Sequence, residues 1–124
     1  MSKKKHSLQQ QTIDLLRSAM AEPHAHPLML FVRLLGSHPA AWFLNQVLYW
    51  SDRTTDEQGW FYRSLQDWQQ QDRLSRYQIE RALYGDPRST TPQVRLSELG
   101  IETCVRRTPN GTPVKHYRVN RAVF

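Results

Sequence analysis

The stretch SLQDWQQQDRLSRYQIERAL, residues 64–83, predicts two short helices joined by a tight turn. A serine stands before each helix, at Ser64 and Ser75, and a serine oxygen is a favoured acceptor for the free backbone N–H groups at a helix start. Only Asp-Arg-Leu separates the two segments, which leaves room for a turn and nothing more. We therefore expect helices over 65–71 and 76–84. Their apolar sides consist of Leu65 and Trp68 in the first helix, and of Ile79, Ala82 and Leu83 in the second.

A β-hairpin is expected downstream of this pair. Residues 101–120 contain two β-prone runs on either side of TPNGTP, and the Asn-Gly pair at its centre is the strongest short-range hairpin signal. Gly-Asp-Pro at 85–87 ends the second helix of the pair. PQVRLSEL then predicts a further helix over 92–99, with Gly100 as the residue that terminates it.

The segment upstream of the pair predicts the centre of the core. AAWFLNQVLYWSD, residues 40–52, is apolar on nearly every face, which is typical of a buried central helix whose aromatic residues belong to the core. Ser37 and Pro39 mark its start. LMLFVRLL, residues 28–35, is a short apolar run, and its periodicity fits a strand or a helix. TIDLLRSAMA, residues 12–21, predicts a short amphipathic helix.

Length and composition favour one domain of modest size. The chain has 124 residues, of which 39% are hydrophobic, and this is sufficient for a small core. We expect a flexible basic tail over 1–10 and a single domain over 11–124, with a short aromatic strand over 60–63. No apolar run is long enough to span a bilayer, so no membrane partner is expected. The single cysteine, Cys104, excludes an internal disulfide and suits a reducing cytoplasm.

The positive charge is concentrated in the second half of the chain. Residues 73–124 carry ten Lys/Arg and four Asp/Glu, a net charge of +6, whereas residues 1–72 carry seven of each sign and balance. A neutral half followed by a basic half favours a polyanionic partner such as nucleic acid, although solubilising charge would give the same total.

The order of elements indicates how such a partner would be bound. Two helices joined by a tight turn, followed by a long hairpin, is the plan of a winged helix-turn-helix domain. The predicted fold class is therefore α+β and mostly helical, with a C-terminal β-hairpin wing. A duplex major groove accepts one helix, so we expect the helix over 76–84 to present its first turns to base edges while the helix over 65–71 braces it.

Residue types on the second helix fit this role. Gln can pair with adenine and Arg with guanine through two hydrogen bonds each, and a helix start with its cap suits a phosphate. The expected DNA contacts from the turn, the helix and the loop after it are Arg73, Ser75, Arg76, Tyr77, Gln78, Arg81 and Arg88.

The hairpin has the composition of a phosphate-contacting wing, because basic residues surround a small tip. Residues 106 and 107 are neighbours in an extended strand, so their side chains are expected on opposite faces, and they cannot serve one surface equally. The expected contacts from the wing are Arg106, Arg107, Asn110, Lys115, His116 and Arg118.

The same residues leave two other functions open. A winged helix can act as an adaptor that binds a protein partner in a nucleoprotein assembly, with Tyr77, Tyr84 and the aromatic strand as its interface. Single-stranded nucleic acid is a third possibility, but it requires aromatic side chains along a basic groove, and the aromatics here are expected to be mostly buried.

No catalytic or metal-binding pattern accompanies these features. His24 and His26 have no ligand cluster beside them, and Asp56 and Glu57 are typical of a polar turn. We find no nucleophile elbow, Walker motif or dinucleotide glycine pattern. The expectation is a protein that is not an enzyme and that needs no metal or cofactor.

Several segments resemble the winged-helix proteins of bacteriophages, plasmids and other mobile elements, many of which are replication-initiation proteins related to the DnaD-type N-terminal domain. The resemblance covers about residues 28–120. It implies duplex DNA binding through 75–84 and the 104–118 hairpin, in replication initiation or transcriptional regulation, and self-association as a homodimer through the N-terminal helices. A cytoplasmic, nucleoid-associated location and a protein partner from the replication or transcription machinery would follow. The segments concerned are AAWFLNQVLYWSDR, GWFYRSLQDWQQQDRLSRYQIERAL, LSELGIETCVRR and NGTPVKHYRVN.

The sequence departs from that family in one place. In those proteins the second helix runs directly into an LxxLG segment, whereas here YGDPRSTTPQV, residues 84–94, lies between them. We expect this insertion to shorten the helix or to add a loop with contacts of its own. The chain also ends soon after the hairpin, without the helicase-loading domain of a full initiator, which favours a standalone DNA-binding protein or a fragment.

Overall fold

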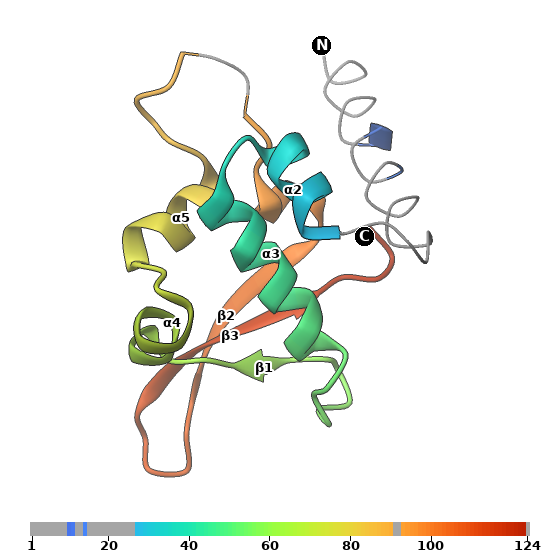
Figure 1. Cartoon of the computed structure of the whole chain (residues 1–124). Coiled ribbons are helices and arrows are strands. Elements are labelled where there is room, and N and C mark those ends of the chain that lie inside the picture. The colour runs from blue at the N-terminus through green and yellow to red at the C-terminus, as the bar shows by residue number, and fades with distance from the viewer. Residues whose placement is uncertain (1–9, 12–13, 15–26, 91–92, 124) are drawn as a thin grey trace.

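The computed structural model describes residues 10–11, 14, 27–90 and 93–123 (Figure 1). Apart from residues 10, 11 and 14, the predicted tail over 1–10 and the predicted helix over 12–21 lie outside the described residues. The described part of the chain is an α+β structure, as expected, with helices on one face of a three-stranded antiparallel sheet. Its α-helices are α2 (Pro27–Leu35), α3 (His38–Ser51), α4 (Leu65–Asp72) and α5 (Arg76–Tyr84).

The apolar run over 28–35, whose periodicity fits a strand or a helix, forms the helix α2. Phe31 is buried at 1% exposure while Arg33 is exposed, so α2 turns one side toward α3 and the other toward solvent. Gly36 follows at φ 69°, a left-handed conformation that glycine adopts without strain, and it turns the chain into α3. The hydroxyl of Ser37 then accepts the backbone N–H of Ala40 and caps α3 as predicted.

Helix α3 crosses the middle of the molecule and contributes much of the core (Figure 1). The prediction that its aromatic residues are core residues was only partly correct. Trp42 and Trp50 are half-buried, and Tyr49 is 43% exposed because the apolar surface of α3 extends beyond the elements that cover it. The buried residues of α3 are Ala41, Phe43, Leu44, Val47 and Leu48.

The sheet contains the predicted hairpin and the predicted aromatic strand. The strands are β1 (Phe61–Tyr62), β2 (Ile101–Arg107) and β3 (Pro113–Val119), and their order is β1-β3-β2. Phe61 pairs with Tyr117, and both side chains are buried against the helices. Tyr62 pairs with His116 on the opposite face of the sheet, which is the face without helices.

The helix predicted over 92–99 forms only in its second half, because Leu96–Leu99 is the short 3₁₀ turn η1. Residue 92 lies outside the described residues, residues 93–95 are not helical, and Arg95 is extended at φ −109° and ψ 120°. The physical reason is that the Gln93 side chain is bonded to the backbone of Asp86, which holds residues 93–95 away from a helical path. Leu96 and Leu99 nevertheless bury their side chains in the core.

The two capped helices form as predicted. The Ser64 hydroxyl accepts the backbone N–H of Asp67 at 3.0 Å, and Trp68 of α4 is completely buried. Leu65, which was expected on the buried side of α4, is 41% exposed because it lies in the first turn, where α4 borders an open cleft. Arg73 has φ 57° and ends α4 in the left-handed conformation.

A buried ion pair holds the turn between α4 and α5 against α3. Arg63 Nη2 lies 2.5 Å from Asp72 Oδ2, and both side chains are 6% exposed. The indole N–H of Trp42 on α3 donates to Asp72 Oδ1 at 3.0 Å. The guanidinium of Arg63 also lies over the rings of Trp50 and Trp68, at 5.3 and 4.7 Å from their centroids. These contacts fix where α4 ends and therefore where α5 begins.

Candidate nucleic-acid interface

The outward face of α5 is aromatic and cationic. Because its buried residues lie on one side, the opposite side carries Tyr77 and Tyr84, which are 54% and 49% exposed. Arg81 lies four residues after Tyr77 and three before Tyr84, so it shares their helix face, and its guanidinium carbon is 4.1 Å from the centroid of the Tyr77 ring. The Tyr84 hydroxyl bonds to that of Thr103 on β2 at 3.2 Å, which links α5 to the hairpin.

Arg76 and Gln78 lie on the two flanks of this face. Arg76 pairs with Glu80 at 3.0 Å, and its side chain is 77% exposed. Gln78 closes a capping box, in which its Oε1 accepts the backbone N–H of Ser75 at 2.9 Å and the Ser75 hydroxyl accepts the N–H of Gln78 at 3.2 Å. The oxygen that an adenine contact would need therefore already accepts one bond, which fixes the direction of the Gln78 side chain, and the Ser75 hydroxyl already accepts a bond as a helix cap.

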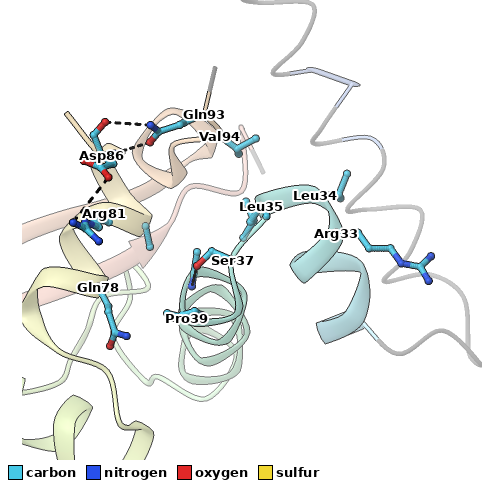
Figure 2. Close-up of a pocket in the computed structure, with 13 residues that line it drawn as sticks. Arg33, Leu34, Leu35, Ser37, Pro39, Gln78, Arg81, Asp86, Gln93 and Val94 are labelled. Atoms are coloured by element: carbon cyan, nitrogen blue, oxygen red, sulfur yellow. Dashed lines mark hydrogen bonds and ion pairs between the residues drawn. The ribbon is translucent and has the colours of Figure 1, made fainter. Parts of the chain in front are cut away.

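A cleft with a volume of about 560 Å³ separates Gln78 and Arg81 from the corner between α2 and α3 (Figure 2). Its far wall is formed by Leu34, Leu35 and Pro39, and its upper edge by Asp86 and the loop after α5. Arg33 borders this cleft, but Figure 2 shows its guanidinium pointing away from α5.

A second cleft lies between the start of α5 and the hairpin, and the structure brings two of the expected cations to it. Arg76 from α5 and Lys115 from β3 both line this space of about 410 Å³, together with Leu65 from α4 and its N-cap Ser64. Lys115 also lies 5.9 Å from the centroid of the Tyr117 ring.

Arg107 and Lys115 share one face of the hairpin. Arg107 pairs with Pro113, and Val105 pairs with Lys115. Because side chains alternate along a strand, all four lie on the face of the hairpin that also carries Tyr117, which is buried closer to the core. Arg107 is exposed and has no partner among the described residues. Asn110 is exposed at the tip of the hairpin.

The other predicted wing residues lie on the opposite face of the sheet, which we call the outer sheet face. Arg118 donates from Nε and Nη2 to Glu102 Oε1 at 2.8 and 2.5 Å, and its guanidinium lies 4.4 Å from the centroid of Trp60. Arg106 lies 5.2 Å from the same ring and 3.8 Å from Asp56. The His116 ring packs 5.6 Å from that of Tyr62. The strand register therefore places Arg106 and Arg107 on opposite faces of the hairpin, as expected.

The carboxylate of Asp56 lies beside Arg106 and has a lowered pKa. The backbone N–H of Trp60 donates to Asp56 Oδ2 at 3.0 Å, as does that of Gln58, and the Trp60 bond is the main cause that lowers the pKa of Asp56 below its ordinary value. The loop before β1 is therefore tied to the outer sheet face by a carboxylate that stays ionised at neutral pH.

The remaining predicted residues lie near α5. Arg73 is exposed in the turn between α4 and α5, and Arg88 is exposed in the loop that follows α5. Sequence reasoning left Tyr84 out of the DNA-contacting residues, although its spacing of seven from Tyr77 places both on one helix face. It also missed Asp86 and Gln93, because a contact between a loop and a helix has no periodic signal.

The described residues contain no group of three or more His, Cys, Asp or Glu that could hold a metal ion, and no helix among them is long and apolar enough to cross a membrane. Comparisons with protein-family models, with curated proteins and with solved structures find no match to this chain.

Proposed function

We propose that this chain is a winged-helix domain that binds double-stranded DNA, with α5 in the major groove and the β2–β3 hairpin as its wing. Replication initiation or transcriptional regulation in a mobile element is the proposed setting. The observation that carries the proposal is the shared cleft between α5 and the hairpin, to which Arg76 and Lys115 both contribute. Glu80, the partner of Arg76, also lines this cleft. A helix and a wing that each bring a cation to one cleft suit one groove and its adjacent backbone.

The charges on this side of the molecule support a polyanion. Arg73 and Arg107 are exposed without an acidic partner among the described residues, and Lys115 makes only a ring contact there. Arg76 has one partner, Glu80, which shares its helix and is itself partly exposed. The acids of the outer sheet face are instead matched to Arg106 and Arg118. We define the phosphate set as Arg73, Arg76, Arg107 and Lys115.

Fluorescence anisotropy with random-sequence duplex DNA across a salt series tests the proposal. Neutralisation of each phosphate changes the slope of log K against log salt by about −0.9, so the phosphate set predicts a slope of about −3 to −4 per chain. Arg107→Ala should weaken binding to all duplexes and reduce the size of the slope by about 1.

Arg121→Ala is the matched control for that variant. It removes the same charge from an exposed arginine, but Arg121 pairs with Asp52 at the end of α3, away from α5 and the hairpin tip. If Arg121→Ala and Arg107→Ala change the binding and the slope equally, the interface is elsewhere.

The outer sheet face supports a second candidate function, that of an adaptor for a protein partner. Tyr62 is 64% exposed there, beside His116 and a shallow pocket of about 320 Å³ that Trp60 also lines. An exposed aromatic residue next to a pocket is typical of a protein interface. Tyr62→Ala should then abolish capture of a stoichiometric protein partner and leave duplex binding unchanged, whereas retained capture would remove this face from consideration.

A homodimer is proposed with the DNA-binding role, because two copies would read half-sites one helical turn apart. Sedimentation equilibrium with and without a selected duplex tests this. A single chain on each duplex would contradict it.

A further inference from the structure

In the loop after α5, described at residues 85–90 and 93–94, the two described parts are hydrogen-bonded to each other beside the C-terminal end of that helix. The Asp86 N–H donates to Gln93 Oε1 at 2.6 Å, and Gln93 Nε2 donates back to the Asp86 carbonyl at 3.1 Å. The side-chain amide of Gln93 therefore clamps both polar backbone groups of one residue. Gly85 permits this approach, because a Cβ there would lie 2.9 Å from Gln93 Oε1 at a φ of 83°.

The clamp orients the carboxylate of Asp86. Its Oδ1 accepts the backbone N–H of Arg88 at 2.9 Å, which leaves Oδ2 directed at α5. Oδ2 lies 3.9 Å from Arg81 Nη2, and Figure 2 shows Asp86 joined to Gln93 on one side and to Arg81 on the other. The loop thus reaches α5 through one charged contact.

Arg81 is held between this carboxylate and an aromatic ring. Its guanidinium lies over Tyr77, and the side chain is 44% exposed on the outward face of α5. Among the described residues, no acceptor is hydrogen-bonded to its N–H groups. A planar guanidinium held by a ring and a carboxylate keeps its remaining donors available in one orientation.

In the major groove, the partner that matches such a fork is guanine, whose O6 and N7 accept two parallel N–H bonds. Lysine cannot reproduce this contact, because its ammonium is a point charge without a planar fork. Gln78 on the neighbouring flank is a poorer candidate for a base contact, because the bond from the Ser75 N–H to its Oε1 turns its side chain back toward the start of α5.

We propose that Arg81 is a specificity-determining residue that recognises a guanine, and that Asp86 is a positioning residue through which the 85–94 loop orients it. This inference rests on the proposed binding of duplex DNA by α5. It assigns a role to the segment by which this sequence departs from the winged-helix proteins it resembles.

The test begins with selection of bound sequences from a random duplex pool by the wild-type chain. Affinities are then measured for the selected duplex and for duplexes in which each guanine is replaced in turn. Arg81→Ala should remove the preference for guanine at one position, a loss of about 10-fold in discrimination, and Arg81→Lys should not restore it.

Asp86→Asn tests the positioning role without removing the loop. The amide keeps an oxygen for the Arg88 N–H and the size of the side chain, but it loses the charge that faces Arg81. Discrimination at the same position should fall about 3-fold, the scale of one exposed ion pair. Asp52→Asn is the control, since it makes the same charge change at an exposed pair with Arg121.

The outcomes separate the inference from the function on which it rests. Loss of the guanine preference in Arg81→Ala, together with a fall in discrimination in Asp86→Asn that Asp52→Asn does not show, supports the inference. Duplex binding with a guanine preference that survives Arg81→Ala, or that is no weaker in Asp86→Asn than in Asp52→Asn, or with no sequence preference at all, overturns the inference and leaves duplex binding intact. Absence of duplex binding by the wild-type chain overturns both.

Discussion

Removal of the Asp72 carboxylate should destabilise the protein far more than removal of any exposed acid. Its partner Arg63 is 6% exposed, and Arg63 Nη2 lies 2.5 Å from Asp72 Oδ2. Asp72→Ala would leave a buried guanidinium whose only remaining hydrogen bond among the described residues is to Gln71 Oε1, at 2.8 Å. It would also leave the Trp42 indole N–H without its acceptor.

The cost follows from the burial. Breaking a buried ion pair by removal of one partner costs about 3–5 kcal/mol, because the other charge stays uncompensated. A domain of this size has a free energy of unfolding of about 5–15 kcal/mol, so the loss is a large share of the total. The midpoint of thermal unfolding should fall by roughly 10–25 °C.

Urea denaturation followed by tryptophan fluorescence and circular dichroism measures this loss. Asp52→Ala is the matched control, because it breaks an ion pair whose side chains are 55% and 64% exposed, and it should cost less than about 1 kcal/mol. The double variant Arg63→Met/Asp72→Leu should recover most of the stability, since both charges are then absent. If Asp72→Ala costs no more than Asp52→Ala, the reasoning that this pair anchors the turn is refuted.

Two further variants probe the helix cap and the core. Ser75→Ala should lower the free energy of unfolding by about 1 kcal/mol, because the N–H of Gln78 loses its acceptor. An unchanged urea midpoint would contradict the capping role. Burial raises the pKa of the Tyr117 hydroxyl above its ordinary value. The neutral side chain therefore contributes fully to the free energy of unfolding below about pH 10, and this contribution is lost as the pH rises through the pKa of the folded state. Tyr117→Phe should therefore shift alkaline unfolding to higher pH, and an unchanged alkaline midpoint would show that other groups control it.

Local signals predicted the elements whose causes are local. The serines at 64 and 75 mark both helix starts because each cap bonds within its own first turn. The Asn-Gly pair placed the hairpin, and alternation separated Arg106 from Arg107, since turn chemistry and strand period depend on neighbouring residues.

The errors concern contacts between distant residues. Residues 93–95 of the helix expected over 92–99 are not helical because Gln93 bonds to Asp86, and the composition of PQVRLSEL gives no sign of that partner. The sequence predicted that Arg106 and Arg107 lie on opposite faces of the hairpin, but it did not predict which of the other basic wing residues share a face with each. Arg118 is matched to Glu102 across the hairpin and stacked on Trp60, and neither contact has a sequence period.

Duplex DNA binding by α5 and the hairpin can be tested by the anisotropy titration of random-sequence duplex DNA across a salt series, with an equal-length single strand alongside. We expect duplex binding that is tighter than single-strand binding and that weakens with a slope of about −3 to −4 in log K against log salt. Arg107→Ala should reduce that slope while Arg121→Ala does not. Absence of duplex binding at low salt would contradict the account and would favour the outer sheet face as the functional surface.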